Sequence, residues 1–293
     1  MSENPILRSI ENQEWLQPIE HKGPELIRNA FAAAGSAGQA AKNVLHGVWL
    51  KHPLHAAITD VPVGSWTVAT ALDVLEMRGH PEYRSGADAA VMVGLIGAIP
   101  AALSGMTDWS EADGRAQRVG AVHGILNVGA AAMYAGSYAA RKSNKRGLGR
   151  WLGFLGFGFV LASSYLGGEL SYALKLGTNH APDPEGELPH DYTAAIPEAE
   201  LTEGKPAKAT VNGTDLVIVK RGAQIYALAA KCAHLGGPLP EGELEGNSII
   251  CPWHGSKFCL EDGHVENGPA TSHQPALDVK VENGQVLVRA QRG

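Results

Sequence analysis

Four stretches of the chain between residues 56 and 174 contain few charged side chains, and they set the strongest limit on the fold. Residues 89–106 and 151–168 contain no charge, and residues 119–140 contain none apart from His123. Residues 56–75 form the weakest stretch, because they include Asp60, Pro62 and Asp73. Crossing the hydrocarbon of a bilayer takes about 20 mostly apolar residues. The sequence therefore predicts a four-helix transmembrane bundle over residues 48–175, with a soluble Ala- and Gly-rich bundle as the alternative.

Small and aromatic residues agree with the membrane interpretation. Gly120 and Gly124 have the GxxxG spacing that allows helices to approach closely. Trp151, Tyr165 and Tyr172 lie near the ends of the last stretch, where interfacial anchors are common. The amino terminus has no signal-peptide pattern, so we expect insertion to rely on these internal helices.

The segments that flank the bundle are polar. We expect residues 1–47 to be an amino-terminal tail, with residues 1–23 poorly ordered and a helix from 24 to 50 that starts with Pro24 in its first turn. This helix is amphipathic on the membrane surface in one interpretation, and packed on the rest of the protein in the other. Residues 176–205 are rich in Pro and Glu, which predicts an extended linker.

From residue 206 to 293 the hydrophobic period changes to two, which predicts a small all-β antiparallel domain. Residues 216–220 and 225–228 are short β-rich runs. Residues 279–281 and 285–289 flank Asn283–Gly284, the commonest sequence for a two-residue hairpin turn. Asn212–Gly213 predicts a second hairpin. The fold class is thus multidomain, with an all-α membrane bundle followed by an all-β domain.

Two short segments of the β domain have the spacing of metal-binding loops. Cys232 and His234 form a C-x-H pair, and Cys251 and His254 form a C-x-x-H pair sixteen residues later. Two thiolates suit one ferric ion and two neutral imidazoles suit the other, so the four predict a mixed-ligand [2Fe–2S] cluster. A structural zinc site is the rival. Zinc fingers, however, usually pair residues of one type, whereas Cys and His alternate here.

This pattern resembles the Rieske [2Fe–2S] family over about residues 200–290. The resemblance implies that the imidazole edges of His234 and His254 form the electron exit. It also implies a third covering loop, which we place at Gly268-Pro269-Ala270. The residues expected to surround the cluster are Leu235, Gly236, Gly237, Trp253, Ser256, Phe258 and Pro269.

Three of these positions predict a low-to-intermediate reduction potential. High-potential members of the family carry a disulfide where this chain has Gly237 and Trp253, and a Tyr where it has Phe258. Ser256 remains to donate a hydrogen bond to cluster sulfur. We expect the remaining thiol, Cys259, to be a small buried apolar residue.

Residues 48–175 resemble a bacterial family of small four-helix membrane domains without an agreed function. The resemblance rests on His52-Pro53-Leu54-His55, residues 60–64, Thr107-Asp108-Trp109, Arg118 with His123, and residues 167–170. It implies architecture rather than mechanism.

Polar side chains inside these helices allow three hypotheses. A b-type haem could be held by His123 together with His52 or His55. In the second hypothesis, which we favour, His and Asp side chains satisfy one another and fix the helix register. A quinone pocket lined by the same residues is the third. Buried charges in a membrane usually face the bundle interior, so Asp60, Asp73, Asp88 and Asp108 are expected there.

These features favour a membrane-anchored carrier of single electrons, with a redox protein and membrane lipid as partners. The alternatives are a ferredoxin component of an oxygenase system and a redox sensor. A terminal oxygenase needs a further iron domain, which we do not expect in a chain that ends at Gly293. A net charge of −6 argues against nucleic acid. The oligomeric state is left open by the sequence.

The sequence also bears on localisation, with conflicting signals. We expect a multi-pass protein of the bacterial inner membrane. The basic loop 141–146 favours a cytoplasmic position for that loop and an external β domain. The absent disulfide and cytoplasmic cluster assembly favour a cytoplasmic β domain, which we prefer.

Overall fold

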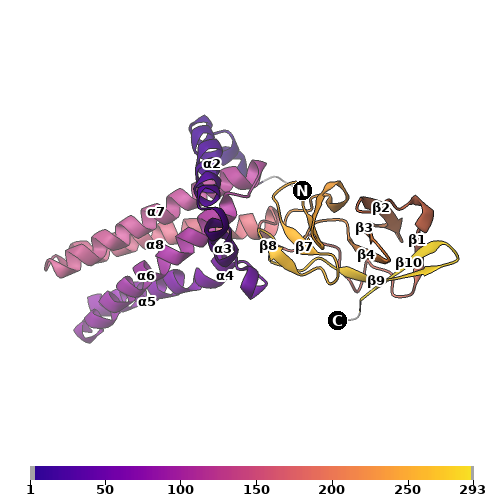
Figure 1. The fold of residues 1–293 in the computed structure, drawn as a ribbon. Helices are drawn as coiled ribbons and strands as arrows, with labels where there is room; N and C mark the ends of the chain where they lie inside the picture. Colours follow the sequence, from indigo (N-terminus) through magenta and orange to yellow (C-terminus); the bar gives the residue numbers. More distant parts are fainter. Residues whose placement is uncertain (1–3, 292–293) are drawn as a thin grey trace. The chain divides into compact units, whose positions relative to one another are not determined.

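The computed structural model describes residues 4–291, which divide into two compact units (Figure 1). Unit 1 contains residues up to 38 and residues 54–176, and it is helical. Unit 2 contains residues 39–53 and residues from 177 onward, and its core is a pair of β-sheets. The multidomain plan of a helical part followed by an antiparallel β domain is therefore confirmed.

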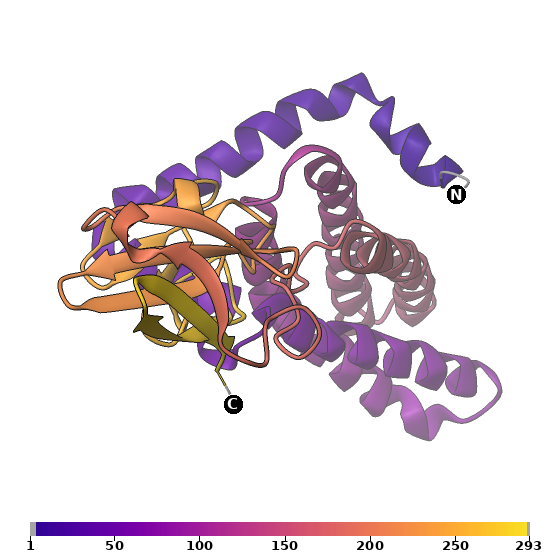
Figure 2. The same ribbon diagram turned by 90° about the vertical axis from the view of Figure 1, so that its right-hand side faces the viewer.

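Four long helices form the body of unit 1. They are α5 (Asp60–Met77), α6 (Arg84–Trp109), α7 (Gly114–Lys142) and α8 (Arg146–Gly168), which continues as the π-helical turn η4 (Glu169–Ala173). Helices α5 and α6 form one antiparallel hairpin and α7 and α8 another (Figures 1 and 2). Contacts of α6 with α7 and of α5 with α8 close the bundle.

Three of these helices are long and apolar enough to cross a membrane. They correspond to residues 81–109, 114–142 and 146–173. Helix α5, preceded by the short α4 (Leu54–Ile58), is not among them; it carries Asp60, Asp73 and Glu76. The stretch that the sequence marked as weakest is thus the one that is not a candidate span.

Glycine allows large aromatic side chains to fill the bundle centre. Trp66 stacks on Tyr134 with ring centroids 4.3 Å apart. A methyl group on Gly94 would lie 2.2 Å from the Trp66 ring, and one on Gly156 would lie 3.0 Å from the Tyr134 ring. Only one glycine of the GxxxG pair lies at a close contact. A methyl group on Gly120 would lie 2.6 Å from the Trp109 ring, whereas Gly124 has no neighbour within 4 Å of that position.

The amino-terminal segment is helical, which corrects the expectation of a disordered tail. It forms α1 (Pro5–Glu11), η1 (Glu14–Leu16), α2 (Gln17–Ala33) and α3 (Gly35–His46). Pro24 lies inside α2 rather than in the first turn of a helix from 24 to 50. Leu7, Ile10 and Leu16 are buried against the α7–α8 hairpin, which gives this polar sequence enough apolar contact to fold.

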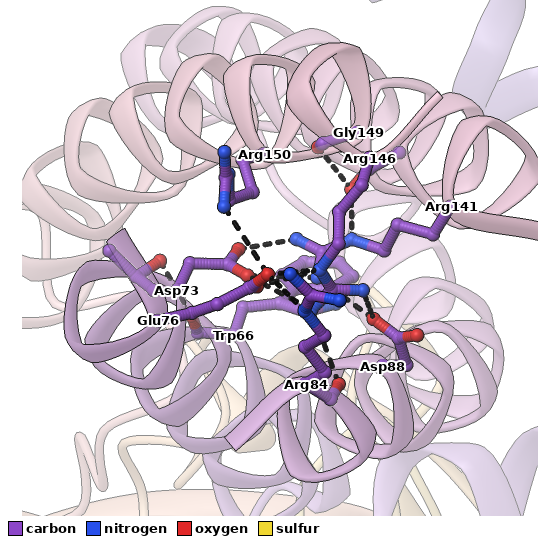
Figure 3. A network of polar contacts seen from close by, with 11 residues as sticks. Trp66, Asp73, Glu76, Arg84, Asp88, Arg141, Arg146, Gly149 and Arg150 are labelled. Atoms are coloured by element: carbon purple, nitrogen blue, oxygen red, sulfur yellow. Dashed lines mark hydrogen bonds and ion pairs between the residues drawn. The ribbon is translucent and has the colours of Figure 1, made fainter. Parts of the chain in front are cut away.

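A network of charged side chains closes one end of the bundle (Figure 3). Arg141 of α7 is fully buried and bonds both carboxylate oxygens of Asp73 of α5, as well as Asp88 of α6 at 3.0 Å. Arg146 of α8 bonds Glu76 at 2.6 and 2.7 Å and Asp88 at 2.8 Å. Each carboxylate expected to face the interior at this end therefore has an arginine partner.

Unit 2 contains two antiparallel sheets. The strand order is β1-β10-β9-β4-β3-β2 in the first sheet and β5-β6-β7-β8 in the second. The strands of the first sheet are β1 (Thr193–Pro197), β2 (Pro206–Val211), β3 (Thr214–Arg221), β4 (Gln224–Ala229), β9 (Ala276–Glu282) and β10 (Gln285–Ala290). Those of the second are β5 (Glu243–Glu245), β6 (Ser248–Ile250), β7 (Lys257–Cys259) and β8 (Val265–Asn267).

The two hairpins predicted from the sequence are confirmed. Asn283 and Gly284 connect β9 to β10 with φ of 52° and 74°, and Asn212 and Gly213 connect β2 to β3 with φ of 52° and 87°. Two successive positive φ values are what a type I′ turn requires.

The boundaries of the β domain differ from those expected in two places. Residues 193–197, assigned to the linker 176–205, form β1 and pair with β10. Residues 39–53, assigned to the tail and the membrane domain, belong to unit 2, where Val48 of the short η2 turn (Val48–Leu50) packs on the core. Neither segment has the regular alternation that predicts a strand, because each is held in place by contacts with residues far along the chain.

Replacing Arg141 tests the buried network. Arg141→Ala leaves the buried Asp73 carboxylate without its counterion, and removing one member of such a pair costs about 3–5 kcal/mol. We therefore expect a large drop in the thermal unfolding temperature in detergent, partly restored in Arg141→Lys. Arg78→Ala, at an exposed position at the end of α5, is the matched control. Equal unfolding temperatures for Arg141→Ala and Arg78→Ala would contradict the assigned role.

Candidate metal centre

Two loops of unit 2 bring the four expected metal ligands together. Cys232 and His234 follow β4, and Cys251 and His254 follow β6. Cys232 and Cys251 are both buried in one core cluster of unit 2, and the His234 and His254 rings lie with centroids 5.0 Å apart. Residues far apart in the sequence thus place two sulfurs and two imidazoles around one position.

Both loops are closed by the same pair of backbone hydrogen bonds. The Cys232 amide donates to Gly237 at 2.9 Å, and the Gly236 amide returns to the Cys232 carbonyl at 2.9 Å. In the second loop, Cys251 donates to Ser256 at 2.8 Å and Gly255 returns to Cys251 at 3.1 Å. Gly236 and Gly255 have φ of 78° and 74°, a conformation that favours glycine at the fifth position of each loop.

Two of the four residues are held in the protonation state that an iron ligand needs. The neighbouring Cys232 thiol is the largest cause that lowers the pKa of Cys251 to about 6, whereas the contact with Cys251 and burial raise the pKa of Cys232. Burial also lowers the pKa of His234 well below its ordinary value. Thiolate and neutral imidazole are the protonation states that bind a metal.

An orphaned nitrogen supports the fit of a metal to these residues. Nδ1 of His234 is buried and has no hydrogen-bond partner among the described residues. Leaving a buried polar atom unsatisfied normally costs about 1–3 kcal/mol, so a ligand at this atom accounts for its position.

The expected surroundings of the cluster divide into a buried and an exposed part. Phe258 and Ser256 are fully buried, and Pro269 is buried in the third loop. The Ser256 hydroxyl accepts a hydrogen bond from the Ala270 amide at 3.0 Å, which ties the second loop to the third and leaves its own hydrogen for another acceptor. Trp253 is 57% exposed.

The other expected residues of the first loop are at least half-buried, and Gly237 lies close to the second loop. Leu235 and Gly236 are half-buried, and a side chain on Gly237 would meet Sγ of Cys251 at 2.7 Å and the Trp253 ring at 3.2 Å.

Gln274 is a residue of the site that the sequence did not indicate. It is 1% exposed, accepts from the Ala233 amide at 3.0 Å, and donates to the carbonyls of Ala229 and Lys231 at 2.7 and 2.8 Å. It therefore holds the backbone on both sides of Cys232. A lone Gln after a Ser-His pair carries no sequence signal for such a role.

Cys259 differs from the expected buried apolar residue. It is half-buried at the end of β7, where its sulfur and ligand atoms of Asp262 and His264 lie within 4.8 Å of one another. Asp262 uses one oxygen to accept from the amide and the ring of His264 at 3.1 and 2.7 Å.

The three histidines considered for a cofactor of the helical part belong to different units of the structure. His52 is exposed and belongs to unit 2, whereas His55 and His123 of unit 1 have ring centroids 6.2 Å apart. Nδ1 of His123 lies 2.9 Å from the Ser163 carbonyl, and its Nε2 accepts from Asn127 at 3.0 Å. Both ring nitrogens of His123 are thus engaged, and Nδ1 of His55 lies 2.9 Å from the Ala101 carbonyl. These partners are not the Asp side chains that the favoured hypothesis expected.

Replacing Gln274 tests how the first loop is held. Gln274→Ala leaves an amide and two carbonyls beside Cys232 without their partner, at about 1–3 kcal/mol for each group that stays dry. We expect faster loss of iron and of visible absorbance on mild heating. Gln224→Ala, at an exposed position of β4, is the control. Identical rates of iron loss in the two variants would contradict this role.

Comparisons with known proteins divide the chain in the same way. Residues 191–281 match the Rieske [2Fe-2S] domain, and residues 51–180 match the family described as predicted membrane protein (DUF2231). The ferredoxin component of the naphthalene 1,2-dioxygenase system of Pseudomonas putida is 31% identical over 94 residues, which are 32% of this chain and 90% of the ferredoxin.

Two further comparisons cover only the β domain. Apoptosis-inducing factor 3 of Homo sapiens is 32% identical over 93 residues, 32% of this chain but only 15% of that protein's length. The solved ferredoxin of carbazole 1,9a-dioxygenase from Nocardioides aromaticivorans is 25% identical and matches 34% of this chain and 98% of its own, with a TM-score of 0.33. The chain belongs to the Rieske [2Fe–2S] family, with its Rieske domain joined to a predicted membrane domain of the DUF2231 family.

Proposed function

We propose that this protein is a membrane-anchored Rieske-type carrier that passes single electrons between redox partners. The observation that carries the proposal is the convergence of Cys232, His234, Cys251 and His254 in two identically closed loops. We assign these four residues as the ligands. When bound, a [2Fe–2S] cluster supplies a centre that accepts and releases one electron.

The residues of the chain prepare the site for this role. The low pKa of Cys251 and the depressed pKa of His234 keep thiolate and neutral imidazole available near neutral pH. Gln274 and Ser256 fix the loops, so the ligands need not reorganise when the charge of the site changes. Phe258 and Gly237 provide no hydroxyl and no disulfide, which supports the expected low-to-intermediate potential.

The helical part supports attachment to a membrane. Three apolar helices and membership of a predicted membrane protein family carry this inference. We place the Rieske domain on the cytoplasmic side, because the family's stabilising disulfide is missing and Cys259, the thiol outside the ligand set, forms no disulfide.

A ferredoxin component of an oxygenase system is the second candidate function. The 31% identity to such a ferredoxin of Pseudomonas putida over nearly its whole length favours it. Its partners would be a reductase and an oxygenase. A redox sensor, in which cluster state alters the helical part, has no comparable observation in its favour.

A redox titration tests the proposed carrier. Full-length protein in detergent should titrate as a one-electron centre and, when reduced, give the paramagnetic-resonance signal of a mixed-ligand [2Fe–2S] cluster. His234→Cys should lower the potential, because a thiolate in place of a neutral imidazole adds negative charge. His190→Cys, at an exposed position away from the loops, should leave it unchanged. Zinc without iron after anaerobic preparation would sink the proposal.

Extraction tests the membrane anchor separately. The full-length protein should sediment with membranes, resist washing with high salt, and enter solution only with detergent, because three apolar helices contact lipid. Full-length protein that remains in the supernatant after high-speed centrifugation without detergent would show that the helices form a soluble bundle.

A further inference from the structure

The turn that follows β7 has the same backbone closure as the two ligand loops. The Cys259 amide donates to the His264 carbonyl at 3.0 Å, and the Gly263 amide returns to the Cys259 carbonyl at 3.0 Å. Gly263 has a φ of 69°, close to the values of Gly236 and Gly255 at the matching positions of the ligand loops. The chain contains three cysteines, and each of them begins a loop that is closed in this way.

This third closed loop carries metal-binding side chains at matching positions. Its first residue is a cysteine and its fourth is Asp262, whereas the second ligand loop has Cys251 and His254 at these places. Its sixth residue, His264, adds an imidazole. The Cys259 sulfur, a carboxylate oxygen of Asp262 and a ring nitrogen of His264 all lie within 4.8 Å of one another. A tetrahedral ion with bonds of about 2.0–2.3 Å places its ligand atoms roughly 3.5 Å apart, so only small side-chain movements are needed to bind one.

Hydrogen bonds already hold the loop and two of these side chains in place. One carboxylate oxygen of Asp262 accepts from the amide and from the ring of His264, at 3.1 and 2.7 Å. The Gly263 carbonyl accepts from the Gln274 amide at 2.8 Å, and Leu260 of the loop is buried in the core. The side chains of Asp262 and His264 are 59% and 44% exposed, so an ion can reach them from solvent. Binding therefore orders little that is not ordered beforehand.

The set of donor atoms selects the class of ion. A thiolate, an imidazole and a carboxylate together suit zinc, whereas calcium and magnesium prefer sites built from oxygen. Three protein ligands leave one tetrahedral position of zinc for water. Closure of the turn itself requires none of the three side chains, because backbone atoms supply both closing hydrogen bonds. A bound zinc ion accounts for the presence of all three at one turn.

We propose that Cys259, Asp262 and His264 form a second metal site, which binds one zinc ion outside the iron–sulfur cluster. The site shares no residue with the four cluster ligands, so its existence does not depend on the proposed electron transfer. Cys259 is the one cysteine of the chain outside that ligand set. Zinc bound to its thiolate would protect this sulfur from oxidation.

Zinc binding to the full-length protein with an intact cluster tests the site. The protein in detergent is incubated with Zn²⁺, desalted, and assayed for both metals. We expect one zinc for every two irons, with the paramagnetic-resonance signal of the reduced cluster unchanged. Competition with a zinc chelator then gives the affinity. Cys259→Ser, Asp262→Asn and His264→Gln should each weaken zinc binding by more than about tenfold, since even the hydrogen-bond partners of metal ligands are typically worth that much.

Matched substitutions and X-ray absorption exclude zinc held by other exposed side chains. His190→Gln and Asp191→Asn change an exposed pair outside the three loops and should leave the zinc affinity unchanged. Absorption at the zinc edge should show one sulfur neighbour at about 2.3 Å, which is lost in Cys259→Ser. The unchanged cluster signal shows that each variant is folded. Failure to retain zinc, equal affinities of Asp262→Asn and Asp191→Asn, or zinc without a sulfur neighbour would each overturn the proposal.

Discussion

Backbone hydrogen bonds that close two short loops are the constraint on which the site depends. In each loop a cysteine amide reaches forward five residues, and the amide of a glycine returns to the cysteine carbonyl. This closure buries both cysteines and brings the two histidine rings to a centroid distance of 5.0 Å. The loops in turn need a fixed background, which Gln274 supplies for the first and the Ser256–Ala270 contact supplies for the second. Phe258 fills the core between them.

The helical unit depends on a different constraint, which is that buried charged side chains need partners of opposite charge. Asp73, Asp88 and Glu76 would each be costly without a partner, and arginines from α7 and α8 bond all three. The network therefore fixes which helix ends meet. It does so in the same way that a polar residue fixes the register of a helix pair. The glycines facing Trp66 and Tyr134 then allow the helices to pack around two large rings.

Much of this architecture could be predicted because its signals are local. The two ligand loops, the Asn-Gly turns and the uncharged helices each lie within a short stretch of sequence. The errors concern contacts between distant segments. Strand β1 lacks alternation and exists because it pairs with β10, and α1 folds because Leu7 and Ile10 meet α7 and α8. The hydrogen bonds of Asn43 and Gln274 could not be predicted from the sequence either, because both side chains bond backbone atoms that lie far along the chain.

The central claim is that two thiolates hold one iron and two imidazoles hold the other in the full-length protein. Mössbauer spectroscopy of the iron-enriched protein tests it most directly. The account predicts two inequivalent iron sites of equal intensity and, after one-electron reduction, a ferrous signal confined to the imidazole-bound site. Two equivalent sites, or a single mononuclear iron, would contradict it.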